Sequence, residues 1–254
     1  MIDIHSHILP GIDDGAQTIE DSIKMAKEAV NEGIKTIIAT PHHKNNQFFN
    51  TRPTIITKVN ELNTILRQED IPLTILPGQE VRIYGEVIED YFKEEILTLH
   101  HTKYLFIEFP SSSVPRYSER LLYELQTEGI IPIIVHPERN KELQDKPELL
   151  YQFVKNGALT QVTASSIVGY FGKNIKKFSE QLIEHNLTHF IASDAHNTHN
   201  RGFKMIEAFD FINESFGSDY IYLFKENAEL LIKDKNIIKE IPERIQRKKF
   251  LGIF

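Results

Sequence analysis

The sequence contains no cysteine among its 254 residues. This absence excludes disulfide bonds, zinc sites with cysteine ligands and every mechanism that proceeds through a thiolate nucleophile. The chain also lacks a run of about 20 apolar residues, the length that a membrane-spanning helix needs. Its N-terminus lacks a positive region followed by a continuous apolar stretch, so we expect a cytoplasmic protein without a transmembrane segment.

The chain carries no excess of positive charge, since its formal net charge is -7. This balance argues against a general electrostatic attraction to nucleic acid or to an anionic membrane. No Gly/Ser linker, repeat or low-complexity tract divides the chain, and 41% of its residues are hydrophobic, enough to bury a core. We therefore predict a single domain over residues 1–254.

Short apolar runs alternate with longer segments whose apolar residues recur at helical spacing. This alternation is typical of β/α units and a parallel sheet. Helices are predicted over residues 18–33, 54–68, 115–129, 148–156, 174–186, 203–216 and 227–234. Seven strands are predicted over residues 1–7, 35–43, 73–80, 103–110, 131–138, 159–166 and 189–196. The chain is therefore predicted to have an α/β fold.

Most of the predicted strands end in residues that bind metal ions. In a parallel barrel the carboxyl ends of all strands lie on one face, so these side chains converge. His5 and His7 share a strand face because side chains alternate with period two. A lone His-x-His is more often a structural pair, but its repetition at successive strand ends favours a metal site. The candidate ligands are His5, His7, Asp14, His42, Glu80, Glu108, His136, Asp194 and His196.

These candidates comprise five histidines and four carboxylates. They are too many for one ion and too rich in oxygen for a structural zinc site, so a cluster of two or three divalent ions that share Glu80 fits better. Manganese, iron and zinc suit such ligands about equally. Ions about 3.5–4 Å apart hold a bridging hydroxide and clamp the attacking and leaving oxygens of a phosphate ester. The predicted chemistry is hydrolysis.

The loops that follow the strands also carry cations, which suggests an anionic substrate. Arg139 is the strongest candidate because it follows His136 closely. The cations of these loops are Lys44, Arg82, Arg116, Arg139 and Arg201.

The remaining histidines fall into two groups. His100, His101 and His189 precede their strands, so we expect them at the opposite rim, and His185 lies at a helix end; these four are expected to be exposed or to act as caps. His43 and His199 lie close to candidate ligands and are predicted to flank the site.

The motifs MIDIHSHILPGIDDG, ATPHH, GQE, FIEFP, HPERN and ASDAHN have the order and spacing of the polymerase-and-histidinol-phosphatase (PHP) superfamily. The chain resembles its CpsB/CapC branch most closely, the YwqE-like tyrosine-protein phosphatases of Gram-positive bacteria. The resemblance covers nearly the whole chain. It implies a distorted seven-stranded (β/α) barrel, three divalent ions with manganese preferred, and dephosphorylation of a bacterial tyrosine kinase that governs capsule or exopolysaccharide synthesis.

The resemblance also implies a role for each candidate residue. One ion would be held by His5, His7, Glu80 and Asp194, a second by Glu80, Glu108 and His136, and a third by Asp14, His42 and His196. Arg139 and Arg201 fall where the branch binds phosphate. Because the chain has no cysteine, a metal-bound hydroxide is expected to attack phosphorus.

Three other functions remain open at this stage. A small-molecule phosphoesterase of the histidinol-phosphate phosphatase type would use the same ligands. An amidohydrolase also begins with His-x-His, but it commonly places a modified lysine where this chain has Glu108. A regulatory protein without turnover is disfavoured by the full ligand set. Self-association is open, as is the role of the basic and then apolar tail PERIQRKKFLGIF. This tail is expected to be frayed or packed on the barrel rather than to anchor to a membrane or dock a partner.

Overall fold

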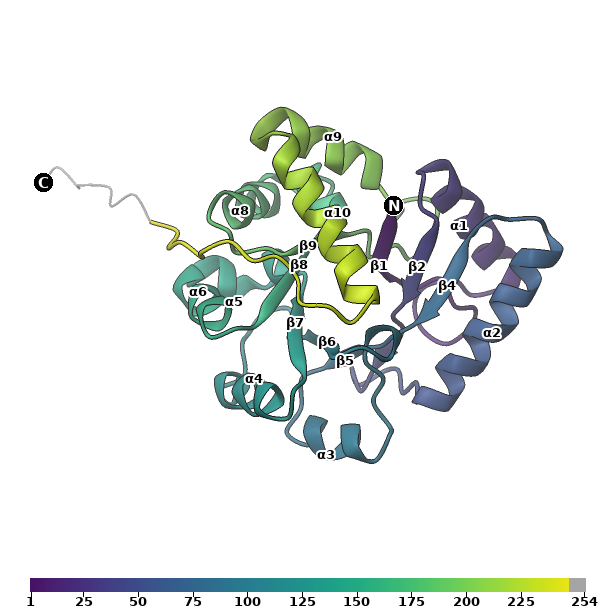
Figure 1. Ribbon diagram of the computed structural model, residues 1–254, viewed down its shortest axis with the longest axis horizontal. Coiled ribbons are helices and arrows are strands. Elements are labelled where there is room, and N and C mark those ends of the chain that lie inside the picture. Colours follow the sequence, from purple (N-terminus) through teal and green to yellow (C-terminus); the bar gives the residue numbers. More distant parts are fainter. Residues whose placement is uncertain (247–254) are drawn as a thin grey trace, which may run out of the picture.

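A computed structural model describes residues 1–246. Its strands run parallel to one another wherever they pair. They are β1 (Ile2–Ser6), β2 (Thr36–Ala39), β3 (His42–His43), β4 (Thr74–Pro77), β5 (Glu80–Arg82), β6 (Tyr104–Glu108), β7 (Ile131–Val135), β8 (Leu159–Thr163) and β9 (Phe190–Ala192). The predicted α/β class is confirmed (Figure 1).

The strands form two sheets that follow one another around a distorted barrel. One sheet has the order β1-β2-β4, and the other has the order β3-β5-β6-β7-β8-β9. Two of the predicted strands are each broken in two, at residues 40–41 and 78–79, so that β3 continues β2 and β5 continues β4. The first and last strands meet where the backbone N–H of His7 donates to the carbonyl of Ala195 over 2.8 Å. The seven predicted strand positions thus surround one axis.

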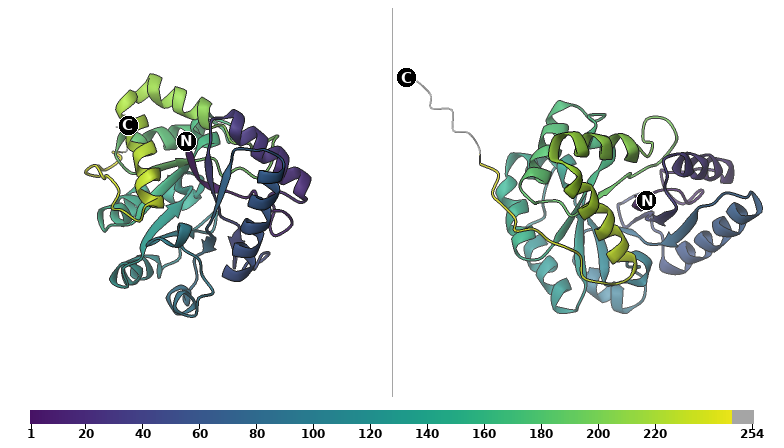
Figure 2. Two further views of the ribbon diagram at one scale, coloured as in Figure 1. Left: turned by 45° about the vertical axis from the view of Figure 1, so that its right-hand side comes forward. Right: turned by 45° about the horizontal axis from the view of Figure 1, so that its top comes forward.

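Helices cover the outside of these strands. They are α1 (Ile19–Asn31), α2 (Arg52–Gln68), α3 (Val87–Phe92), α4 (Ser118–Thr127), α5 (Lys141–Asp145), α6 (Pro147–Lys155), α7 (Ala164–Ile167), α8 (Lys173–Glu184), α9 (Met205–Phe216) and α10 (Ser218–Ile232). Helix α1 begins as its sequence predicts, because Thr18 and Asp21 form a capping box. Both views in Figure 2 show α1 and α2 side by side on one flank of the strands.

Alternating side chains of the strands supply two apolar clusters. In β6, Tyr104 and Phe106 belong to the smaller cluster, whereas Leu105 and Ile107 face the larger one that the helices cover. Leu231 of α10 also packs in the smaller cluster. The segment that follows α10 lies at the amino end of β6, where Asp234 accepts a hydrogen bond from the Lys103 backbone over 2.9 Å. The carboxyl ends of the strands therefore stay open for a site.

The amino ends of the strands correct one expectation. His189 precedes β9, as predicted, but it is neither exposed nor a cap. It is buried, and its Nδ1 accepts a hydrogen bond from the Thr160 backbone over 3.1 Å.

Within residues 1–246, no helix is both long and apolar enough to cross a membrane. The described part of the predicted C-terminal tail runs along the outside of the molecule (Figure 1). The Glu243 backbone donates to the His185 carbonyl over 2.8 Å, and Arg244 pairs with Glu148 over 3.1 Å. This part packs on the chain's own fold, which is one of the two expected arrangements, and residues 247–254 lie outside the described residues.

Candidate metal centre

His5 and His7 point into one buried site at the carboxyl end of β1. The Nε2 atom of His5 lies 3.5 Å from the Glu80 carboxylate and 3.4 Å from that of Asp194. The Nε2 atom of His7 lies 3.3 Å from each of the same two carboxylates. Side chains from β1, β5 and the end of β9 therefore converge, as the strand-end pattern predicts.

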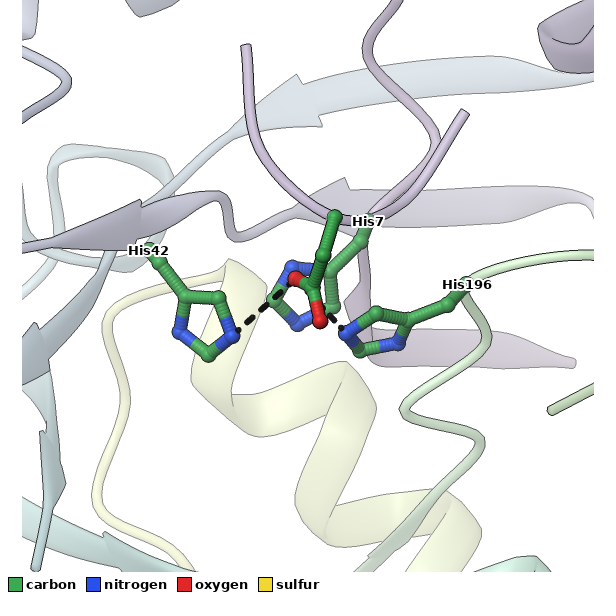
Figure 3. A group of neighbouring side chains, drawn as sticks. His7, His42 and His196 are labelled. Atoms are coloured by element: carbon green, nitrogen blue, oxygen red, sulfur yellow. Dashed lines mark ion pairs between the residues drawn. The ribbon is translucent and has the colours of Figure 1, made fainter. Parts of the chain in front are cut away.

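A second group of donors lies nearer the surface. One Asp14 oxygen is 3.4 Å from Nε2 of His42 and 3.4 Å from Nε2 of His196. Figure 3 shows His42 and His196 on opposite sides of this carboxylate, with His7 behind it. The Asp14 side chain is 45% exposed, so this group forms the open edge of the site.

The third group surrounds Glu80. Its Oε1 atom lies 2.7 Å from Nε2 of His136, and its Oε2 atom lies 2.8 Å from Nδ1 of His42. Glu108 lies on the same side, 3.7 Å from Nδ1 of His42. The two oxygens of Glu80 thus contact histidines of all three groups of donors. Glu80 is fully buried, so these contacts are shielded from solvent.

The charges of the site shift the pKa values of its members. Burial favours the neutral form of Glu108 and the charge of Glu80 adds to this effect, so the pKa of Glu108 rises to about 7. Burial also opposes the ionisation of Glu80, but His42 and His5 hold its pKa well below its usual range. Burial lowers the pKa of His136 to about 3, and the charge of Arg139 acts in the same direction. Carboxylates crowded in this way are stabilised by cations.

The donor atoms fit divalent metal ions. Within residues 1–246, three sets of residues each bring their ligand atoms within 4.8 Å of one another. They are His7, Asp14, His42 and His196; His5, His7 and Glu80; and His42, Glu80 and Glu108. Within this described range, Nδ1 of His42, Nε2 of His196 and Oε2 of Glu80 are buried and have no partner at hydrogen-bond geometry, although Nδ1 of His42 and Oε2 of Glu80 lie 2.8 Å apart. A buried polar atom without a partner is costly, and imidazole and carboxylate together suit manganese, iron and zinc. These atoms have the position and chemistry of metal ligands.

The backbone at the site adopts uncommon conformations. His136 and Asp194 have positive φ angles of 37° and 52°. Such strain persists in folded proteins mainly where function needs it. A side chain at Gly15 would overlap the carbonyl oxygen of His7, so only glycine lets the loop of Asp13 and Asp14 approach β1 this closely.

Two arginines lie beside the donors. Arg139 is 2.6 Å from Oδ2 of Asp194, and Arg201 is 3.4 Å from the same oxygen and 3.3 Å from Asp14. Both line a cavity of about 220 Å³ together with His42, Glu108 and His136. The cavity is therefore lined both by candidate metal ligands and by guanidinium groups.

The other cations of the strand-end loops have different partners. Lys44 pairs with Asp90, Arg82 lies 3.0 Å from Glu108, and Arg116 lines a separate surface groove beside α4. His43 is buried and bonds the Asn50 carbonyl over 2.8 Å, whereas His199 is exposed beside the site.

Sequence reasoning missed two buried residues that orient the histidines. Asp13 accepts a hydrogen bond from Nδ1 of His7 over 2.7 Å, and Gln161 accepts one from Nδ1 of His5 over 2.8 Å. These bonds direct Nε2 of each imidazole toward Glu80 and Asp194. The signal for Gln161 is period two in β8, because Gln161 shares a strand face with Leu159, which packs in the smaller cluster.

Gln161→Leu is expected to weaken metal binding by about 10- to 100-fold, because His5 loses the partner that fixes its tautomer and ring orientation. Calorimetric titration of the metal-free protein with Mn²⁺ measures this. Gln152→Leu on α6, whose partner is Glu148 at the surface, is the matched control. An unchanged affinity in Gln161→Leu would show that His5 keeps its orientation without this bond.

Comparison with known proteins agrees with the residue pattern. A family model for capsular polysaccharide synthesis, CpsB/CapC, matches residues 1–233. Tyrosine-protein phosphatase YwqE of Bacillus subtilis (strain 168) is 51% identical over 254 residues, which cover 100% of both chains. The putative tyrosine-protein phosphatase CapC of Staphylococcus aureus is 41% identical, again over 100% of both chains.

The likeness extends to the fold. A solved structure from work on YwqE of Bacillus subtilis and CpsB of Streptococcus pneumoniae, there called unique metal-dependent tyrosine phosphatases, matches with a TM-score of 0.96. Its sequence identity is 51%, and the match covers 97% of this chain and 100% of that chain. The expected resemblance is confirmed, and the chain belongs to the CpsB/CapC family.

Proposed function

We propose that the chain is a metal-dependent phosphatase that hydrolyses phosphotyrosine in proteins. The observation that carries this proposal is the cavity of about 220 Å³ that candidate metal ligands and two arginines line together. The chain's 51% identity to a tyrosine-protein phosphatase over its whole length supports the same activity. The absence of cysteine excludes the thiolate mechanism for this hydrolysis.

The candidate ligands are proposed to bind three divalent ions in the sets that the family resemblance implies. Glu80 would belong to two of these sets, which agrees with its contacts to His5 and His136. When bound, such ions neutralise phosphoryl oxygens and lower the pKa of water, so that a nucleophile is available at neutral pH.

The protein's own side chains would then position the substrate. Arg139 and Arg201 each present a planar fork of donors that matches the oxygens of a phosphoryl group. Their contacts with Asp194 hold both guanidinium groups at the cavity wall. A phenolate leaving group, with a pKa near 10, departs more easily than an alkoxide, so tyrosine esters suit the site.

The remaining features of the proposal come from the family. Its description names capsular polysaccharide synthesis. The proposed substrate is a cytoplasmic tyrosine kinase that controls capsule or exopolysaccharide production. Manganese is the proposed metal, and residues 1–254 are proposed to act as one phosphatase domain. A histidinol-phosphate phosphatase would use the same donors, so turnover of histidinol phosphate in preference to a phosphotyrosine peptide would contradict the proposal.

Removal of metal is expected to abolish activity. Because the proposed nucleophile depends on divalent ions, a chelator should stop hydrolysis of a phosphotyrosine peptide and added Mn²⁺ should restore it. Thiol alkylation should have no effect, since there is no cysteine to modify. Kinetic assays on the chelated and reloaded protein, with metal content determined for each, measure this. Full activity after exhaustive metal removal would overturn the proposed mechanism.

A further inference from the structure

A second, larger concavity adjoins the cavity that holds the two arginines. It is a groove of about 800 Å³, and its lining includes Asp14, His196 and the side chain of Phe48. Arg201, which lines the smaller cavity, lies 3.3 Å from Asp14. Groove and cavity therefore meet at the open edge of the candidate metal centre.

Phe48 lies where these two spaces meet. Its ring is nearly parallel to the imidazole of His42, with an angle of 8° between the planes and 6.2 Å between the centroids. His42 lines the cavity, whereas Phe48 lines the groove. A planar apolar surface thus stands directly outside the donors that would surround a phosphoryl group.

The loop that carries Phe48 is held in place by its own hydrogen bonds. Oδ1 of Asn45 accepts from the Phe48 backbone over 2.9 Å, and the Lys44 backbone donates to the Phe48 carbonyl over 2.9 Å. Asn50 closes the loop, since its side chain donates to the His42 carbonyl over 2.9 Å. The backbone that carries the ring is therefore fixed by the chain's own hydrogen bonds.

Other aromatic rings near the cavity are already engaged. Phe109 is buried and packs edge to face against Phe153. The face of Phe171 is covered by the guanidinium of Arg139 at 5.5 Å, and that of Tyr84 by the ammonium of Lys44 at 4.3 Å. Phe48 has a half-buried ring that borders open space.

We propose that Phe48 is a specificity-determining residue of this site, on which the phosphotyrosyl ring stacks while its phosphoryl group occupies the cavity beside Arg139 and Arg201. The inference rests on the proposed function. A tyrosine ring begins one oxygen away from phosphorus, so it must leave the cavity at its mouth. Phosphoserine has no ring to place there, and aromatic stacking therefore favours tyrosine over serine.

Phe48→Leu tests this, since it removes the ring and keeps an apolar side chain. An aromatic pair contributes enough that KM for a phosphotyrosine peptide should rise about three- to tenfold, with kcat changed by less than about twofold. The kcat/KM for the phosphoserine peptide of the same sequence should stay unchanged. In the metal-loaded protein, a peptide with a non-hydrolysable phosphonate in place of phosphotyrosine should bind more weakly by the same factor.

Two further variants make the test specific. Phe48→Tyr keeps the ring and should stay within about twofold of the wild type, because stacking is retained. Phe49→Leu is the matched control, since Phe49 follows Phe48 directly but is 59% exposed and packs against His43 rather than His42.

The outcomes separate this inference from the proposed function. Unchanged KM and phosphonate affinity in Phe48→Leu, an equal loss with phosphoserine, or the same loss in Phe49→Leu would overturn the role of Phe48 alone. A metal-loaded wild type that does not hydrolyse the phosphotyrosine peptide would overturn the proposed function and this inference together.

Discussion

Replacement of Glu80 by glutamine is expected to remove more than one metal ion and to lower kcat/KM on a phosphotyrosine peptide by more than about 100-fold. Loss of a residue that only orients a ligand typically costs about 10- to 100-fold, and Glu80 is placed to bind the metal itself. Its oxygens lie 2.7 Å from His136, 2.8 Å from His42 and 3.3 Å from His7. No other carboxylate within residues 1–246 belongs to two of the three compact donor sets.

Elemental analysis of the purified variant, combined with steady-state kinetics, measures both effects. Glutamine preserves the shape of the side chain, so a thermal melt shows whether loss of metal or loss of folding is responsible. His101→Ala at the opposite rim is the control and should change neither metal content nor rate, since His101 lies before β6. Full metal occupancy in Glu80→Gln would contradict a cluster that shares this carboxylate.

The sequence predicts the convergence of the site because parallel topology makes the ends of strands meet. His5, Glu80, His136 and Asp194 are far apart in the chain, yet each follows or ends an apolar run. No detailed geometry is needed for this step, since one face of a barrel collects all carboxyl ends. In the structure, His5 lies 3.5 Å from Glu80 and 3.4 Å from Asp194, and Glu80 lies 2.7 Å from His136.

Details that depend on three-dimensional packing are not predictable in this way. Asp13 and Asp14 are adjacent, and only the loop geometry directs Asp13 to Nδ1 of His7 and Asp14 to His42 and His196. The break between β2 and β3, by contrast, has a cause in the sequence itself, because Pro41 has no backbone N–H with which to continue the sheet. Helix α10 begins at Ser218, nine residues before the prediction, because its aromatic first turns obscure the helical spacing.

The second large effect is expected from the two arginines. Arg139 and Arg201 both contact Oδ2 of Asp194, at 2.6 and 3.4 Å, and both line the cavity that His42, Glu108 and His136 also line. A phosphoryl group in this cavity would contact the positive charges of the arginines and of the proposed metal ions. Bonds of this kind strengthen as charge develops in the transition state.

Arg139→Ala and Arg201→Ala are each expected to lower kcat/KM on a phosphotyrosine peptide by about 100-fold, the loss typical when a donor to developing negative charge is removed. Metal content should stay unchanged, because neither residue is among the candidate ligands. Arg139→Lys should restore little activity, since an ammonium is a point charge that cannot form two parallel bonds to a phosphoryl group.

Steady-state kinetics on the three variants, each with its metal content determined, distinguishes substrate binding from metal retention. Arg139 is more buried than Arg201, with side chains 22% and 29% exposed, so its variants also need a thermal melt. Loss of metal in Arg139→Ala would mean that this arginine acts by keeping Asp194 in place. If all three variants retain the wild-type kcat/KM, the phosphoryl group is held by the metal ions alone and both arginines are ordinary charges at the rim.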